Sequence, residues 1–317
     1  MRVSVSGEPP EPRARGELEA LDVTEVRATT ARSAGGDPLV GTRLAGRYRV
    51  IRRIGQGGMG AVYLAEHVHL RARVALKVLH PHLAGDSELL QRFVREARAA
   101  AASGSTHVVR VWDLDRLDDG RYFLAMEYLE GIDLAGWVAA HGPLSIEHAV
   151  STGLQVCAAL RVMHPLGIVH RDLKPENVFL TAHASEPCSV KVLDFGVCKM
   201  AHDRPITGAG MTLGTPKFMA PEQLESGAEV DVRADLYALG AVLFFALIGR
   251  APFEGGSLSR LLYRVCCEPA PKLRSLRSDV PAALEALVER ALAKRPEERF
   301  ADSAALEAAL AQASARI

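Results

Sequence analysis

Short apolar runs of β-strand character fill the chain between residues 48 and 126. Each run is rich in β-branched and aromatic residues, and together they predict five strands: Tyr48–Ile54, Ala61–Val68, Arg73–Leu79, Val108–Leu114 and Tyr122–Met126. One helical pattern interrupts them, because apolar residues recur at helical spacing from Ser87 to Ala102. Ser87 is the predicted N-cap of this helix. The pattern therefore predicts a β-rich unit with one main helix.

From about Asp133 the apolar period becomes mostly helical. The predicted helices are Ile146–Met163, Leu236–Leu247, Leu258–Cys267, Pro281–Ala293 and Ser303–Ala313. The fold class is α+β, with a small β-rich N-lobe over residues 46–129, a larger α-helical C-lobe over residues 130–312 and a short end over residues 313–317. Residues 1–45 are rich in Gly, Pro, Glu, Arg, Ser and Thr, which predicts a disordered tail.

Charge and cysteine content exclude several classes of protein. Lys+Arg and Asp+Glu are both 38, so the formal net charge is zero, which argues against a nucleic-acid or membrane-surface partner. The uncharged stretch Leu236–Gly249 suits a buried helix and is too short to span a membrane. The five cysteines form no C-x-x-C element, and the residues Met1–Gly7 are not a continuous apolar leader. A cytoplasmic location is expected.

A glycine-rich loop has the spacing G-x-G-x-x-G-x-V between the first two predicted strands. Its residues are Gly55, Gln56, Gly57, Gly58, Met59, Gly60, Ala61 and Val62. Glycines let backbone amides approach phosphate oxygens, because no Cβ obstructs them. Alone, the motif is equally typical of a glycine-rich hairpin turn. A strand follows it where a dinucleotide-binding fold would begin a helix, so that fold is disfavoured.

Lys77 stands out because this chain strongly prefers arginine: of its 38 basic residues, only seven are lysine. It lies in the third predicted strand, and a compact ammonium group suits phosphate oxygens in a tight space. A solvated strand lysine is the simpler interpretation of Lys77 taken alone. Glu96 lies at the edge of the apolar face of the predicted helix, where it could turn inward and pair with Lys77, although a helical glutamate is usually solvated.

The strongest local signal is the run His170-Arg171-Asp172-Leu173-Lys174-Pro175-Glu176-Asn177, followed by Asp194-Phe195-Gly196. Two acids and an amide supply the oxygen ligands that a hard divalent cation prefers, and one carboxylate could orient a hydroxyl group. Ala220-Pro221-Glu222 follows downstream. The ordered set is improbable as a chance loop composition.

These motifs identify a resemblance. Residues 48 to about 310 resemble the eukaryotic-like (Hanks-type) serine/threonine protein kinases, and the forms GQGGMGAVY and GTPKFMAPEQ are most similar to bacterial members. The resemblance implies a two-lobed protein kinase fold and transfer of the γ-phosphoryl group of Mg-ATP to Ser/Thr hydroxyls of proteins, including autophosphorylation. It also implies a role in signal transduction.

The resemblance implies a role for each matching residue. The catalytic set would be Asp172, which orients the hydroxyl, Lys174, which neutralises the transferred group, and Lys77, which holds phosphates while tethered by Glu96. Asn177 and Asp194 would bind Mg²⁺, with Mn²⁺ as a substitute. The adenine contacts would be Val62 and Ala75 above, Phe179 below, Met126 behind, and the backbone of Glu127 and Leu129. Structural roles would fall to Glu222 with Arg299, as a buried ion pair, and to Asp235, as an anchor of the catalytic loop, which is the run His170–Asn177.

Two alternatives differ in class. A catalytically silent kinase-fold scaffold predicts losses at Lys77, Asp172 or Asp194, and none is lost. A small-molecule phosphotransferase of related fold would lack a peptide-docking segment, whereas Gly214–Glu222 looks complete. The kinase interpretation is therefore preferred. The sequence does not name the substrate, the activating signal, the organism or the oligomeric state.

Regulation is expected through phosphothreonine. Arg171 beside Asp172 needs an anionic partner, and a phosphate on Thr212, or next on Thr207, would supply it. Thr24, Thr29 and Thr30 lie in the predicted tail, where autophosphorylation would create a site for phosphothreonine-reading proteins. Cys198, at the start of the same segment as Thr207 and Thr212, is interpreted as an inert thiol in preference to a redox switch.

Overall fold

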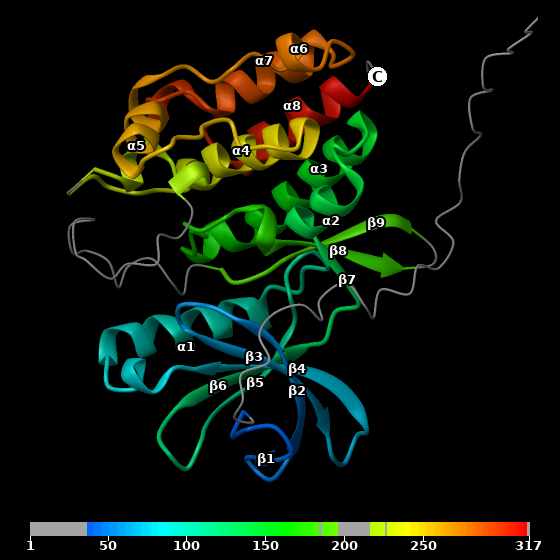
Figure 1. Cartoon of the computed structure of the whole chain (residues 1–317), viewed down its shortest axis with the longest axis vertical. Coiled ribbons are helices and arrows are strands. Elements are labelled where there is room, and N and C mark those ends of the chain that lie inside the picture. Colours follow the sequence, from blue (N-terminus) through cyan, green and yellow to red (C-terminus); the bar gives the residue numbers. More distant parts are fainter. Residues whose placement is uncertain (1–36, 184–185, 196–215, 226, 316–317) are drawn as a thin grey trace, which may run out of the picture. The chain divides into compact units, whose positions relative to one another are not determined.

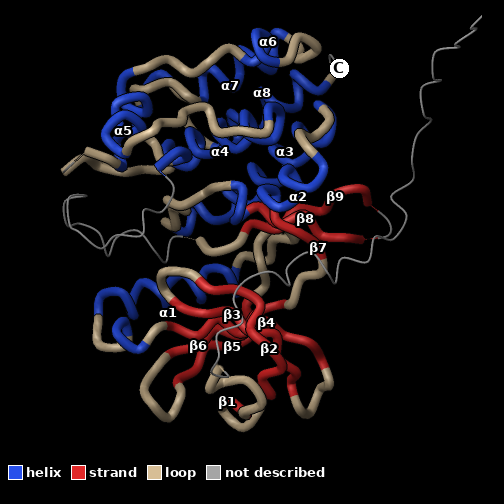
Figure 2. Tube along the Cα trace, viewed as in Figure 1, coloured by secondary structure: helices blue, strands red, loops and turns tan. Residues whose placement is uncertain are grey.

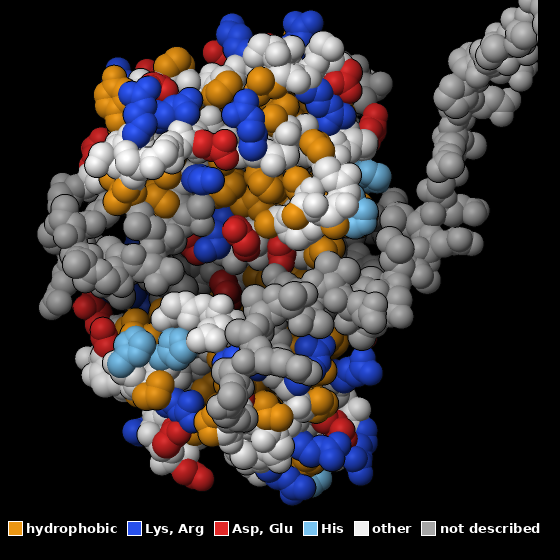
Figure 3. All heavy atoms as spheres, viewed as in Figure 1, with side chains coloured by type: hydrophobic (Ala, Val, Ile, Leu, Met, Phe, Trp, Pro, Cys, Tyr) orange, Lys and Arg blue, Asp and Glu red, His pale blue; other side chains and the backbone are white. Residues whose placement is uncertain are grey.

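The protein is described by a computed structural model that covers residues 37–183, 186–195, 216–225 and 227–315. Figure 1 shows its helices and strands, and Figure 2 separates a β-rich part with one main helix from a helix-rich part. Basic and acidic side chains occur together on the face shown in Figure 3, in keeping with the zero net charge of the chain. No helix in the described ranges combines the length and apolarity that crossing a membrane requires.

The N-lobe is built on a six-stranded antiparallel sheet of order β1-β2-β3-β4-β6-β5. Its strands are β1 (Arg43–Leu44), β2 (Tyr48–Gln56), β3 (Gly60–His67), β4 (Ala72–Leu79), β5 (Val111–Arg116) and β6 (Tyr122–Glu127). The five predicted strands are confirmed, but β5 begins at Val111 and not at Val108. Val108 instead forms a parallel bridge with Val192, a residue of the C-lobe.

Helix α1 (Ser87–Ala102) packs in a small apolar cluster of its own in the N-lobe. Leu89, Phe93 and Ala97 are its buried residues, at the spacing of one helical face. The sequence analysis predicted Ser87 as the N-cap, but the N-cap is Asp86. Asp86 has the extended backbone of a cap, and its carboxylate accepts hydrogen bonds from the backbone N–H groups of Glu88 and Leu89. A carboxylate also interacts favourably with the positive end of the helix dipole.

Part of the predicted tail belongs to the N-lobe. Leu39 and Leu44 are buried in the cluster formed by one face of the sheet. Arg43 pairs with Arg49 in the short ladder of β1 with β2. Segment 37–45 is therefore ordered, where the sequence had predicted disorder up to residue 45. The first 45 residues are polar on average, and this average composition hid the two leucines, Leu39 and Leu44, that are buried in the core of the N-lobe.

The C-lobe is helical around one largely buried helix, α4. Its helices are α2 (Leu134–His141), α3 (Ile146–Met163), α4 (Arg233–Ile248), α5 (Leu258–Cys267), α6 (Leu273–Leu276), α7 (Ala282–Ala291) and α8 (Ser303–Ser314). Helix α4 buries residues all round its circumference, as the uncharged stretch Leu236–Gly249 predicted. The five predicted helices are confirmed, and α3 and α5 have the predicted bounds. The short helices α2 and α6 were not predicted.

A second antiparallel sheet, of order β7-β8-β9, was also not predicted. Its strands are β7 (Gly131–Asp133), β8 (Val178–His183) and β9 (Glu186–Val192). Strand β9 joins the N-lobe segment 107–110: the N–H of Val192 donates to the carbonyl of His107 at 2.8 Å, and the N–H of Val109 donates to the carbonyl of Val192 at 3.3 Å. Val108, only 1% exposed, is part of the apolar core of the C-lobe.

Candidate active site

The glycine-rich loop connects β2 to β3, and its glycines differ in what surrounds them. A Cβ on Gly60 would lie 2.0 Å from the carbonyl oxygen of Val78, so only glycine allows this close approach of β3 to β4. A Cβ on Gly57 or Gly58 would meet nothing within 4 Å. The N–H of Gly57 donates to the carbonyl of Gly60 at 2.9 Å, which closes the loop. Gly60 therefore has a packing role, whereas Gly57 and Gly58 leave open space.

This difference gives a prediction about stability. Gly60→Ala is expected to lower the free energy of unfolding by about 2 kcal/mol, because the added methyl group forces the strand backbones apart. Gly58→Ala, in the same loop, is the matched control and should have little effect. Denaturant unfolding of the two variants beside the wild type measures both. Equal unfolding midpoints for the two variants would contradict the packing role of Gly60.

Lys77 lies on β4 with 6% of its surface exposed. The strand register pairs Lys77 with Val62 on one side and with Leu124 on the other. Ala75, two residues earlier on β4, shares the same face because side chains alternate along a strand. The structure thus brings together, on one face of the sheet, the lysine and two of the predicted adenine contacts.

The ion pair of Lys77 differs from the expected one. Its Nζ lies 2.6 Å from Oδ1 of Asp194. Within the described residues, Glu96 makes no ion pair with Lys77, and the buried Oε2 of Glu96 has no hydrogen-bond partner. Burial raises the pKa of Glu96 to about 8, and the charges of Lys77 and Arg171 offset this only in part. The carboxylate of Asp194 has 38% of its side chain exposed, so it pairs with Lys77 at a lower desolvation cost than the buried carboxylate of Glu96 would.

The catalytic loop places its polar residues side by side. The Nζ of Lys174 lies 3.0 Å from Oδ2 of Asp172. The Nδ2 of Asn177 donates to the backbone carbonyl of Asp172 at 2.8 Å. The N–H of Leu193, next to Asp194, donates to the carbonyl of Asn177 at 2.9 Å. The carboxylate of Asp172, the ammonium group of Lys174 and the amide of Asn177 are therefore linked by short contacts, and a backbone hydrogen bond ties Asn177 to the residue before Asp194.

Asp235 of α4 anchors this loop, as the sequence predicted. Its carboxylate, 1% exposed, accepts hydrogen bonds from the backbone N–H groups of His170 at 2.7 Å and Arg171 at 2.8 Å. The Nε2 of His164, which sequence reasoning missed, lies 2.9 Å from the same carboxylate. Arg171 has a φ of 61°, a strained conformation for a residue with a side chain. The buried carboxylate compensates for this strain by binding two successive amides.

The other predicted adenine contacts lie on β6 and β8 and just after β6. Met126 pairs with Ala75 across the β4–β6 ladder, and Leu129 follows at the end of β6. The N–H of Glu127 donates to the carbonyl of Arg110 at 2.9 Å, so within the described residues this amide is already used.

Sequence reasoning missed the partner of the Glu127 side chain. The Nζ of Lys191, on β9, lies 2.6 Å from Oε1 of Glu127, and the N–H of Arg110 donates to the same oxygen at 2.6 Å. Lys191 pairs across the β8–β9 ladder with Phe179, the predicted lower adenine contact. Lys191 is one of only seven lysines, and this rarity was the available signal.

Several predicted features lie outside the described residues. These are Gly196, the threonines Thr207 and Thr212, Cys198, the first two residues of the segment Gly214–Glu222, and the tail threonines Thr24, Thr29 and Thr30. Gln223, within the described part, donates from Nε2 to the carbonyl of Arg171 at 2.8 Å, which links the segment after residue 215 to the catalytic loop.

A β-rich lobe with a glycine loop and a buried lysine, joined to a helical lobe with an acid–lysine–amide loop, defines the protein kinase fold. A family model described as the protein kinase domain matches residues 48–311. The chain belongs to the protein kinase domain family.

Its relatives include bacterial kinases. It is 49% identical over 275 residues to serine/threonine-protein kinase Pkn1 of Myxococcus xanthus, covering 86% of this chain and 39% of that protein. It is 36% identical over 270 residues to serine/threonine-protein kinase PrkC of Bacillus subtilis, covering 85% of this chain and 41% of that protein. The chain thus spans about two-fifths of the length of these two relatives.

A solved structure agrees with this assignment. The crystal structure of the PknI kinase domain of Mycobacterium tuberculosis superposes with a TM-score of 0.67 at 33% identity, covering 86% of this chain and 98% of that one. The predicted two-lobed kinase fold is confirmed.

Proposed function

We propose that this chain is an ATP-dependent protein kinase that phosphorylates Ser/Thr hydroxyls of proteins, including its own. The observation that carries the proposal is the linked set of Asp172, Lys174 and Asn177, together with the ion pair of the buried Lys77 with Asp194. The names of its relatives support the acceptor class. We further propose the lobe limits 46–129 and 130–312, with the ordered segment 37–45 added to the first.

Catalysis by these residues is mainly positioning and electrostatic stabilisation. The carboxylate of Asp172 orients the acceptor hydroxyl and accepts its proton. Lys174, 3.0 Å away, neutralises charge on the transferred phosphoryl group. Lys77 binds phosphate oxygens, which replace Asp194 as its partner when nucleotide is bound. The open space beside Gly57 and Gly58 lets backbone amides of the loop approach the phosphates.

The residues fit a divalent cation of the Mg²⁺ type. Because the Nδ2 of Asn177 is bonded to the carbonyl of Asp172, its amide oxygen is left as a ligand, and Asp194 adds a carboxylate. Among the described residues, no group of three or more His, Cys, Asp or Glu side chains forms a metal site. Phosphate oxygens would complete the shell. When the cation is bound, it neutralises part of the negative charge of the phosphates.

Location and partners are part of the proposal. Cys157, Cys266 and Cys267 are free thiols, which suits a reducing, cytoplasmic compartment. Partners would be protein substrates and, after tail phosphorylation, phosphothreonine-reading proteins.

The experiment is phosphoryl transfer from labelled ATP with Mg²⁺ to the protein itself and to a generic protein substrate. The wild type should label both on Ser and Thr. Lys77→Met should lower the rate about a hundredfold, because a charge at the phosphates is lost. Lys272→Met, at an exposed site in the C-lobe, is the matched control. Transfer by Lys77→Met within threefold of the wild type would reject the role of Lys77, and no transfer by the wild type would reject the function.

A further inference from the structure

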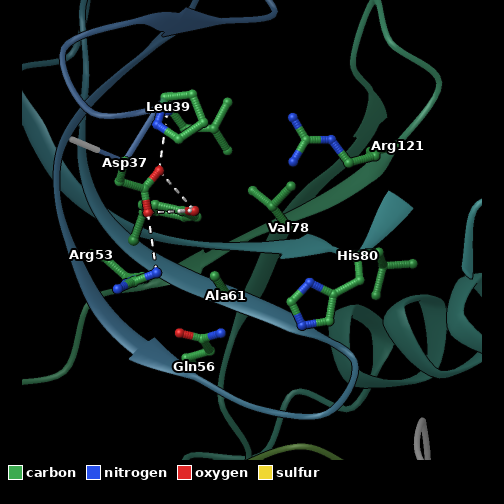
Figure 4. Close-up of a pocket in the computed structure, with 11 residues that line it drawn as sticks. Asp37, Leu39, Arg53, Gln56, Ala61, Val78, His80 and Arg121 are labelled. Carbon is green, nitrogen blue, oxygen red and sulfur yellow. Dashed lines mark hydrogen bonds and ion pairs between the residues drawn. The ribbon is translucent and has the colours of Figure 1, made fainter. Parts of the chain in front are cut away.

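A cavity of about 210 Å³ lies in the N-lobe, and its lining includes Gln56 and Ala61 of the glycine-rich loop. Figure 4 shows Val78 and Ala61 in its middle, with Arg121, His80, Gln56 and Arg53 around them. Its volume is below the roughly 300–1,000 Å³ of typical ligand pockets, so it suits a molecule of about ten non-hydrogen atoms.

The cavity and the predicted nucleotide-binding face are opposite faces of the same strands. Gln56, Ala61 and Val78 are register partners across β2, β3 and β4, and all three line the cavity. The adjacent row of register partners contains Val62 and Lys77. Neighbouring residues of a strand point to opposite faces. The cavity therefore lies directly behind the glycine loop and Lys77.

The cavity wall offers more hydrogen-bond donors than acceptors. The Nη1 of Arg53 lies 3.4 Å from Oδ2 of Asp37, which makes an ion pair. In the described part of the chain, the guanidinium group of Arg53 donates no hydrogen bond to a protein atom. Arg121 uses Nε and Nη2 on Asp119, which leaves the two N–H donors of Nη1.

Asp37 contributes a carboxylate to the cavity wall, and both of its carboxylate oxygens already accept hydrogen bonds from the protein. It accepts hydrogen bonds from the hydroxyl of Tyr63 at 3.1 Å and from the N–H of Leu39 at 3.1 Å, besides the Arg53 ion pair. Burial and the Asp37 charge raise the pKa of Tyr63 to about 12, so this phenol remains a donor. A ligand must therefore bring acceptors for the arginines and an apolar body for the Ala61 and Val78 floor.

One wall residue connects the cavity to the glycine loop. The Nε2 of His80 lies 3.0 Å from the carbonyl of Gly57, and the N–H of His80 donates to the carbonyl of Met59 at 2.8 Å. Gln56 is itself a residue of the loop. A molecule that contacts His80 and Gln56 therefore acts on the segment that would cover the phosphates of ATP.

We propose that this cavity is an effector site for a small organic anion, a carboxylate or a phosphate monoester on a compact apolar body, whose binding changes the affinity of the glycine loop for nucleotide. The planar guanidinium groups of Arg53 and Arg121 suit either anion. That an anion binds here is inferred from the cavity alone. That its binding changes nucleotide affinity rests on the proposed function.

The test uses the full chain and three probes of similar size: benzoate, phenyl phosphate and the neutral benzamide. Binding is measured by ligand-observed NMR, with and without a saturating non-hydrolysable ATP analogue. At least one anion should bind with a dissociation constant of about 1 mM, and benzamide should bind at least fivefold more weakly. The two anions distinguish carboxylate from phosphate recognition.

Variants locate the binding. The double variant Arg53→Gln/Arg121→Gln should weaken anion binding at least fivefold, whereas Arg52→Gln, an exposed neighbour outside the cavity, should change it less than twofold. Thermal unfolding confirms that each variant is folded. Equal affinity in the double variant, equal binding of benzamide, or no anion binding to the full chain would overturn the site.

Whether the cavity is coupled to the nucleotide site is tested by measuring anion binding with and without the ATP analogue. The anion and the ATP analogue should change each other's dissociation constant by the same factor, at least twofold, since coupling is reciprocal. Complete displacement of the anion by the analogue would show binding in the nucleotide site and overturn the proposal. Independent binding of the two would overturn the coupling alone. Because these readouts need no phosphoryl transfer, they stand even if the transfer assay fails.

Discussion

Asp172→Asn is expected to lower kcat for peptide phosphorylation by about a thousandfold and to change nucleotide affinity less than threefold. The substitution keeps the side-chain shape and the backbone carbonyl that Asn177 binds, but it removes the carboxylate that would accept the hydroxyl proton. Loss of a positioned acid or base costs about 10²–10⁴ in rate. Steady-state kinetics measures kcat, and titration with a fluorescent nucleotide analogue measures binding.

The matched control is Asp118→Asn, the same chemical change at an exposed residue of the β5–β6 turn. It should leave both quantities unchanged. A kcat for Asp172→Asn above one-tenth of the wild-type value would show that another group accepts the proton. A similar loss of nucleotide affinity would instead show that the substitution disturbs the binding site as a whole.

Arg299→Met is expected to lower the free energy of unfolding by about 3–5 kcal/mol. The guanidinium side chain is fully buried and contacts both carboxylate oxygens of Glu222, at 2.6 and 2.8 Å, which confirms the ion pair predicted from the sequence. It also donates to the backbone carbonyls of Ala293 at 2.8 Å and Lys294 at 2.9 Å. Removing it leaves a buried charge and several carbonyls without partners.

Denaturant unfolding measures this effect, with Arg295→Met as an exposed control four residues away. A double-mutant cycle with Glu222→Gln separates the pair from its surroundings, because neutralising both partners should cost less than the sum of the two single changes. Additive effects would show that the ion pair itself contributes little. A loss below 1 kcal/mol in Arg299→Met would contradict the prediction.

The long, strongly periodic elements could be predicted because their signal is local. Helix α3 repeats its apolar residues over five turns, and helix α4 is apolar on every side, so neither needed tertiary information. Strand β7 was missed for the opposite reason: it has three residues, and its partner β8 lies far along the sequence. Strands β8 and β9 follow each other in the chain and pair as a hairpin, which the sequence analysis did not predict.

The site was predictable where residue order determines the geometry. Asp172, Lys174 and Asn177 lie within one short loop, and their mutual contacts follow from that closeness. The partner of Lys77 was not predictable, because the choice between Glu96 and Asp194 depends on how deeply each carboxylate is buried. The cavity behind the glycine loop was not predictable either, because it depends on which strands are neighbours in the sheet.

The bridge between Val108 and Val192 has a consequence for how the chain folds during synthesis. Val108 leaves the ribosome long before its partner strand, and until β9 is made this valine and the backbone groups of segment 107–110 have no cover from the C-lobe. We therefore expect the packing of segment 107–110 to be completed only after residue 192 has been synthesised. Expression of the N-lobe alone is expected to leave this segment uncovered and prone to aggregation.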